Sequence, residues 1–129
     1  MNGKSLLDTN IVISIFKDEK NIAKRIRALR KVYIPVVVLG ELYYGAFKSM
    51  RIEKNLNNIS LLLDHISVLQ TNEGTAKIYG EIKTQLKRKG KPIPENDIWV
   101  AAIARQFNLT LITKDGHFKE VDGLKYTLL

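Results

Sequence analysis

The chain has 129 residues, of which 45% are hydrophobic and 26% are charged, and this composition indicates one globular domain over residues 1–129. It contains no cysteine, which excludes a disulfide framework, a thiolate zinc site and a cysteine nucleophile. The formal net charge of +8 favours an anionic partner, of which nucleic acid is one candidate.

The first half of the chain alternates short apolar runs with longer amphipathic segments. In chain order, the sequence predicts a strand over 4–8, helices over 9–17 and 19–31, a strand over 32–35, and helices over 37–47 and 51–65. Thr9 or Asn10 can cap the first of these helices, because short polar side chains accept hydrogen bonds from free backbone N–H groups.

The second half continues the same alternation. The predicted elements are a strand over 66–69, a helix over 73–88, a helix that follows the loop 92–95 and ends near 108, and strands over 109–113 and 125–128. Strands that alternate with helices indicate an α/β fold with a mostly parallel central sheet. Since crossovers between parallel strands are right-handed, we expect helices on both faces and thus three layers, α/β/α.

Four carboxylates lie where such a sheet would bind a ligand. Asp8 ends the first strand and Asp115 follows the strand over 109–113, and ligands bind at the carboxyl ends of parallel strands. Asp97 lies in the first turn of its helix, and Glu41 borders an apolar stripe. Converging carboxylates repel one another, and a hard cation such as Mg²⁺ or Mn²⁺ would neutralise them. A metal ion held in this way can lower the pKa of a bound water and can stabilise charge on a phosphodiester during in-line attack.

Other polar residues could support this chemistry. Thr9 and Thr113 each stand beside an acid and could orient a carboxylate or a phosphate oxygen. A basic cluster that precedes Asp97 could hold an RNA backbone, and it consists of Lys87, Arg88, Lys89 and Lys91. The alternative interpretation of this cluster is a solvated helix end.

Each acid also has a simpler interpretation in isolation. Asp8 could serve only as a helix cap, Asp97 could only complement a helix dipole, and Asp115 before Gly116 is typical of a turn. Glu41 is harder to explain in this way, because an acid at the edge of a buried stripe needs a partner. His117 lies close to Asp115, but the sequence gives it no definite role.

Four ordered motifs resemble those of the PIN-domain family: DTN at 8–10, LGEL at 39–42, NDIWVAA at 96–102 and TKDGHF at 113–118. The resemblance covers nearly the whole chain, whose length is similar to that of VapC-type toxins of prokaryotic toxin–antitoxin pairs. Matched by position, the acids of the family fall on Asp8, Glu41, Asp97 and Asp115. The polar residue of the family matches Thr113, and Asn10 belongs to the first motif.

This resemblance implies a PIN-like nuclease domain with Mg²⁺- or Mn²⁺-dependent endoribonuclease activity on RNA. It also implies a homodimer and a cognate antitoxin that inhibits the enzyme. We expect that inhibitor to place an arginine or lysine among the four acids, where its charge would replace that of the metal ion.

Two other functions stay open from the sequence. A small phosphatase could use Asp8 as its nucleophile, although such enzymes carry a second aspartate where this chain has Asn10. A non-catalytic module could use the basic surface to hold RNA or a protein partner. No targeting or membrane segment is evident, so we expect a cytoplasmic protein.

Overall fold

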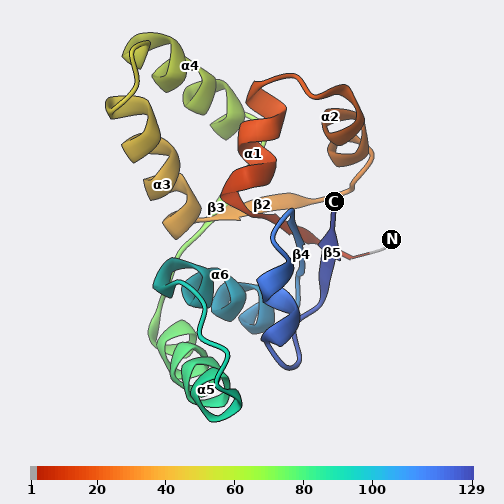
Figure 1. Ribbon diagram of the computed structural model, residues 1–129. Coiled ribbons are helices and arrows are strands. Elements are labelled where there is room, and N and C mark those ends of the chain that lie inside the picture. The colour runs from red at the N-terminus through yellow and green to blue at the C-terminus, as the bar shows by residue number, and fades with distance from the viewer. Residues whose placement is uncertain (1–2) are drawn as a thin grey trace.

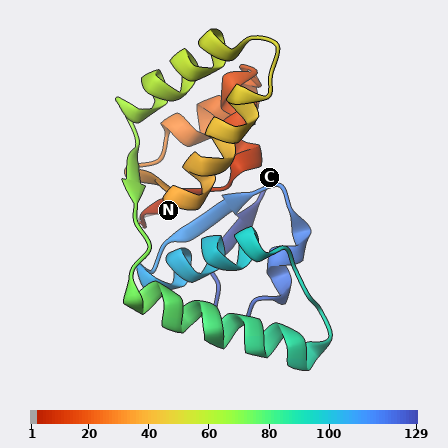
Figure 2. The ribbon, with the colours of Figure 1, turned by 90° about the vertical axis from the view of Figure 1, so that its left-hand side faces the viewer.

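The computed structural model describes residues 3–129, and within them a five-stranded sheet lies between two layers of helices (Figures 1 and 2). The strand order is β3-β2-β1-β4-β5, and each neighbouring pair is parallel. The strands are β1 (Ser5–Leu7), β2 (Val32–Pro35), β3 (Ser67–Leu69), β4 (Thr110–Thr113) and β5 (Tyr126–Leu128). The predicted three-layer α/β fold is confirmed, and each predicted strand is present within one residue at either end.

The helices divide between the two faces according to the direction in which the chain crosses the sheet. They are α1 (Thr9–Phe16), α2 (Lys20–Arg27), α3 (Val36–Phe47), α4 (Ile52–Leu63), α5 (Glu73–Lys89), α6 (Glu95–Gln106) and the 3-10 helix η1 (Gly116–Glu120). From β1 through β2 to β3 the chain adds strands towards one edge of the sheet, and right-handed crossovers place α1–α4 on one face. From β3 to β5 it moves the other way, which places α5, α6 and η1 on the opposite face (Figure 2).

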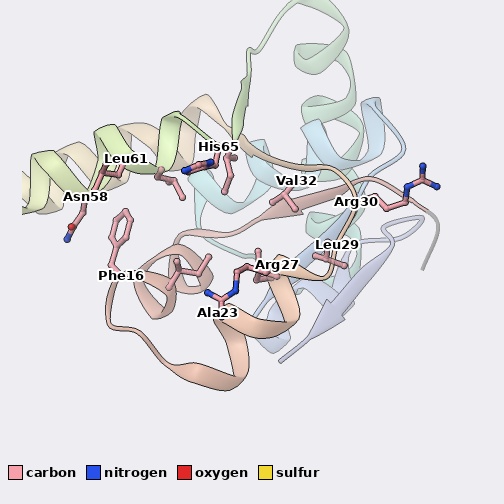
Figure 3. Close-up of a pocket in the computed structure, with 13 residues that line it drawn as sticks. Phe16, Ala23, Arg27, Leu29, Arg30, Val32, Asn58, Leu61 and His65 are labelled. Atoms are coloured by element: carbon pink, nitrogen blue, oxygen red, sulfur yellow. The ribbon is translucent and has the colours of Figure 1, made fainter.

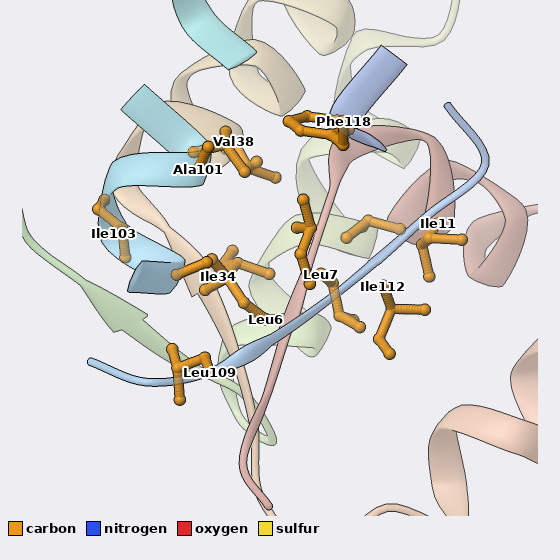
Figure 4. Close-up of a cluster of buried hydrophobic side chains, with 14 of the residues drawn as sticks. Leu6, Leu7, Ile11, Ile34, Val38, Ala101, Ile103, Leu109, Ile112 and Phe118 are labelled. Carbon is orange, nitrogen blue, oxygen red and sulfur yellow. The ribbon is translucent and has the colours of Figure 1, made fainter. Parts of the chain in front are cut away.

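The core joins the sheet to the helices that cover it. Leu6 and Leu7 of β1 are fully buried because this central strand is covered on both faces (Figure 4). Helix α6 is buried from Val100 to Ala104, which explains why its sequence lacks a polar stripe. Among the described residues, no helix combines the length and apolar character needed to cross a membrane.

β1 and β4 are neighbours in the sheet, and the chain builds the two halves of the sheet outwards from them, towards opposite edges. These two strands pair in parallel, with Leu6 opposite Leu111 and Leu7 opposite Ile112. Their carboxyl ends therefore meet at the point where the crossovers diverge to opposite faces, which is the usual ligand position in an open α/β sheet.

Two local predictions differ from the structure. Helix α2 ends at Arg27, four residues before the predicted end at Lys31, because Val32 must pair with Ser5 in the sheet and the chain needs residues to turn. A turn is the local expectation for the segment after Asp115, but this segment forms η1, whose aromatic Phe118 is fully buried. In both places tertiary packing overrides the local pattern.

Candidate metal centre

Asp8 directly follows β1 and is only 4% exposed. Its Oδ1 accepts a hydrogen bond from the Thr9 backbone N–H at 2.9 Å, so Asp8 caps α1 and the predicted cap by Thr9 or Asn10 is wrong. Its Oδ2 accepts from Thr113 Oγ1 at 2.7 Å and from Asn10 Nδ2 at 3.4 Å. Asp8 is thus both a helix cap and a member of a polar cluster.

Thr113 and Asn10 tie the end of β4 to the start of α1. Thr113 is fully buried, and its Oγ1 accepts from the Asp115 backbone N–H at 3.0 Å while it donates to Asp8. The Asn10 Oδ1 accepts from the Lys114 backbone N–H at 3.1 Å. Both residues therefore position the two acid-bearing segments relative to each other.

Glu41 reaches the same cluster from α3, which begins where β2 ends. Thr9 Oγ1 donates to Glu41 Oε1 at 2.6 Å, which links Glu41 to the residue that follows Asp8. The side chain of Glu41 is half-buried. Glu41, which borders the apolar stripe, thus has Thr9 as the polar partner that a partly buried acid needs.

Asp97 and Asp115 are joined by His117. The Nε2 atom of His117 lies 2.7 Å from Asp97 Oδ2, and its Nδ1 lies 2.9 Å from Asp115 Oδ1. Asp97 comes from the first turn of α6, whereas Asp115 caps η1 by accepting from the His117 backbone N–H. Sequence reasoning left His117 without a role, and its place two residues after Asp115 was the available signal.

The carboxylates influence one another electrostatically. The pKa of Asp97 is raised from 3.8 to about 6, first by burial and then by the charge of Asp8, while His117 acts in the opposite direction. Burial also raises the pKa of Asp8 against the hydrogen bond from Thr113, and the charges of Glu41 and Asp115 raise it further. A bound cation would offset both the burial of these two carboxylates and the repulsion between the acids.

The donor set fits a divalent metal ion. Ligand atoms of Asp97, Asp115 and His117 all lie within 4.8 Å of one another. Within residues 3–129, the His117 Nε2 is buried without a well-formed hydrogen bond, and it lies 2.7 Å from Asp97 Oδ2. A buried polar nitrogen needs a well-placed partner, and a metal ion shared with Asp97 could serve as one.

The basic cluster lies at the end of α5 and is not uniform. Lys89 Nζ lies 3.1 Å from Asp122 Oδ1 and donates to the Glu120 carbonyl at 2.9 Å, so its charge is already paired. Within residues 3–129, Lys87, Arg88 and Lys91 are exposed and form no ion pair. Lys91 shares a cavity of about 430 Å³ with Lys119 and His117, and His117 in turn contacts Asp97 and Asp115.

An apolar groove of about 630 Å³ lies between α1, α2 and α4 (Figure 3). Phe16 and Leu61 contribute to its walls, and Arg27 and Arg30 are its cationic side chains. A second cavity, of about 540 Å³, shares Phe16 and Asn58 with this groove and reaches Glu41. The groove therefore adjoins the cavity that reaches the edge of the acidic cluster.

Comparisons with known proteins agree with this arrangement. A model of the PIN domain family matches residues 5–124. The chain is 35% identical over 126 residues to "Ribonuclease VapC1" of Haemophilus influenzae, with 94% of both chains covered. It is 35% identical over 125 residues to "tRNA(fMet)-specific endonuclease VapC" of Shigella flexneri, with 95% of both covered.

Solved structures show the same likeness. A chain in the crystal structure of VapBC2 from Rickettsia felis, bound to a promoter DNA fragment, superposes with a TM-score of 0.92 at 29% identity. The match covers 97% of this chain and 98% of that one. The likeness in fold thus extends over nearly the whole of both chains.

Proposed function

The chain belongs to the PIN-domain family, and from this premise we propose that it is a metal-dependent endoribonuclease and the toxin of a toxin–antitoxin pair. The proposal is carried by one observation, a continuous series of contacts that connects all four predicted acids. Thr9 links Glu41 to the Asp8 end of the series, Thr113 links Asp8 to Asp115, and His117 links Asp115 to Asp97.

In this proposal the acids Asp8, Glu41, Asp97 and Asp115 hold Mg²⁺ or Mn²⁺. When bound, such an ion neutralises the carboxylates, stabilises charge on the phosphodiester and promotes ionisation of water. Thr113 and Thr9 keep their carboxylate partners in fixed orientations through the hydrogen bonds described above. Asn10 supports the site indirectly, because it fixes the backbone at Lys114 next to Asp115.

The substrate in this proposal is RNA, whose backbone would lie along the basic cluster. Among the described residues, Lys87, Arg88 and Lys91 form no ion pair, and Lys91 shares a cavity with His117 beside the acids. Lys89 contributes less, because Asp122 already neutralises it. Phosphate contacts of this kind are independent of base sequence and weaken as salt increases.

The second partner is a cognate antitoxin, which we place in the apolar groove between α1, α2 and α4. The relatives of known structure were solved as VapBC assemblies. A partner segment that covers the groove could continue through the neighbouring cavity to Glu41 and bring an arginine or lysine to the acids. Arg27 and Arg30 would favour acidic side chains on that segment.

We also propose a homodimer in the cytoplasm. Helix α3 and the residues after it expose Tyr44, Phe47 and Met50, and these exposed apolar side chains suit a contact with a second copy. The absence of cysteine agrees with a reducing compartment.

The test is RNA cleavage with mapped ends, using the wild type and the variants Asp97→Asn and Asp8→Asn in Mg²⁺, Mn²⁺ and EDTA. We expect specific cleavage by the wild type in metal ion, none in EDTA, and a loss of at least 100-fold in both variants. Asp64→Asn is the matched control, since Asp64 is an exposed acid at the end of α4. RNA that binds in EDTA but stays intact in both metal ions would overturn the proposal in favour of a binding module.

A further inference from the structure

The imidazole ring of His117 is held in place from two sides. Its Nδ1 faces Asp115 Oδ1 at 2.9 Å, and the same oxygen accepts the His117 backbone N–H at 3.3 Å. On its other side the ring packs against Phe118, which is fully buried, with 4.8 Å between the ring centroids. The orientation of the ring is therefore set before any ligand binds.

This orientation directs the second nitrogen into the acidic cluster. Within the described part of the chain, the Nε2 atom is buried without a well-formed hydrogen bond, and Asp97 Oδ2 lies 2.7 Å from it. Histidines that bind metal ions usually direct one nitrogen to the ion while the other faces a carboxylate, which fixes the ring and its tautomer. Asp115 stands in that position relative to Nδ1.

The spacing of the donor atoms also suits a shared ion. Ligands about 2.1 Å from an ion and at right angles to each other are roughly 3 Å apart. The 2.7 Å between Nε2 and Asp97 Oδ2 is close to this value. An ion could therefore bind both atoms after a small adjustment of either side chain.

We propose that His117 is a metal ligand through Nε2, together with Asp97, and that this nitrogen shifts the preference of the site from Mg²⁺ towards Mn²⁺. The inference rests on the proposed metal-dependent function. Mg²⁺ strongly prefers oxygen ligands and retains its waters, whereas first-row transition ions accept imidazole nitrogen readily. In this arrangement Asp115 positions the His117 ring.

A purely structural role for His117 leads to the opposite expectation. The ring could serve only to bridge Asp97 and Asp115, in the place that a metal ion would take. Removal of His117 would then free both carboxylates and strengthen metal binding. The direction of the change in affinity therefore separates a ligand from a competitor.

The experiment uses the full chain with Mn²⁺ at pH 8 and detects nitrogen coupled to the bound ion by pulsed electron paramagnetic resonance. The chain has only two histidines, so His65→Gln is a matched control. His65 lines the apolar groove and lies outside the acidic cluster. We expect the imidazole signal in the wild type and in the His65→Gln protein, and its loss in the His117→Ala protein.

Metal affinity, measured by calorimetry in the same proteins, is the second readout. We expect His117→Ala to weaken Mn²⁺ binding by about tenfold or more and Mg²⁺ binding by less. His117→Gln returns an oxygen donor near the position of Nε2, so it should recover Mg²⁺ binding without recovering the imidazole signal.

Three results would overturn the inference: no imidazole signal in the wild type, a signal that persists in His117→Ala, or tighter Mn²⁺ binding in that variant. In these cases the proposed nuclease stands if Mn²⁺ binds and RNA is cleaved. A wild-type chain that binds neither Mn²⁺ nor Mg²⁺ would overturn the proposed function as well.

Discussion

Thr113 and Asp8 are separated by 105 positions in the sequence, yet a 2.7 Å hydrogen bond joins the Thr113 hydroxyl to the Asp8 carboxylate. The two residues extend the paired ends of β4 and β1, where Ile112 lies opposite Leu7. This bond lowers the pKa of Asp8 against the larger effect of burial. It therefore helps to keep a buried acid charged and available to a cation.

Replacing Thr113 with valine should show how much this hydrogen bond contributes to stability and to the pKa of Asp8. Valine keeps the shape of threonine but leaves Asp8 Oδ2 without its buried donor and the Asp115 N–H without its acceptor. We expect a loss of about 1–3 kcal/mol in the free energy of unfolding and a higher pKa of Asp8. Urea unfolding in EDTA and a carboxyl NMR titration measure the two effects. Thr113→Ser keeps the hydroxyl, and equal behaviour of the serine and valine variants would contradict the prediction.

The strands and the four acids could be predicted because their signals are local. A buried strand followed by an aspartate is visible in the segment 4–8, and the parallel-sheet rule then places Asp8 and Asp115 at one edge. Glu41 was found for a different reason, since a charged residue beside an apolar stripe must have a partner. Each of these inferences needs only neighbouring residues and a general rule of packing.

The contacts that complete the site depend on distances across the fold and could not be predicted in the same way. His117 is a single residue in a short 3-10 helix, and only the meeting of η1 with α6 brings it to Asp97. Lys89 appeared equivalent to Lys87 and Arg88, but the end of η1 places Glu120 and Asp122 beside it. No periodic pattern in the sequence predicts the contact of His117 with Asp97 or the contacts of Lys89 with Glu120 and Asp122.

The stability of the metal-free protein should fall as pH rises from about 4 to about 6. In this window the folded state binds more protons than the unfolded state, because the pKa of Asp97 is raised from 3.8 to about 6. The difference between the two pKa values corresponds to a total loss of roughly 3 kcal/mol in the free energy of unfolding, most of it between pH 4 and pH 6, and the loss is complete by about pH 7. Urea unfolding in EDTA at a series of pH values provides the measurement.

Asp97→Asn is the control for this effect, because asparagine does not ionise. The unfolding free energy of Asp97→Asn minus that of the wild type should increase from pH 4 to pH 6 in EDTA, because only the wild type loses stability through residue 97 in this window. Saturating Mn²⁺, by contrast, should stabilise the wild type at pH 8, by about 2.7 kcal/mol at 100 times its dissociation constant, and should not stabilise Asp97→Asn to the same extent. Parallel pH profiles of the two proteins in EDTA would show that Asp97 titrates normally.

The free cations at the end of α5 should set the salt dependence of RNA binding. Replacing Lys87, Arg88 and Lys91 with glutamine removes up to three charges that neutralise phosphates, so the slope of log affinity against log salt should decrease by about 0.7 for each of these charges that binds RNA. Lys89→Gln should change this slope less, because Asp122 already pairs with Lys89. Binding of a single-stranded RNA to Asp97→Asn protein, measured from low to moderate salt, tests both statements. An unchanged slope in the triple variant would place the RNA elsewhere.

A substitution in the apolar groove should weaken inhibition by the antitoxin without changing catalysis at the acids. Leu61 lines the groove on α4 and is 54% exposed, so Leu61→Asp should fold normally and leave the acidic cluster unchanged. A carboxylate at this position would have to lose its water on antitoxin binding, and we expect an affinity loss of at least tenfold, or about 1.4 kcal/mol. Ile52→Asp is the matched control, since Ile52 is an exposed apolar residue of α4 that does not line the groove.

Two measurements distinguish the possible outcomes at the groove. RNA cleavage by the isolated Leu61→Asp protein should match the wild type, because Leu61 belongs to the groove wall and does not line the second cavity, which reaches Glu41. Titration with the cognate antitoxin should then restore less inhibition in Leu61→Asp than in Ile52→Asp. If the two variants are inhibited equally, the antitoxin reaches the acids by another route, because a segment seated between α1, α2 and α4 cannot avoid this side chain.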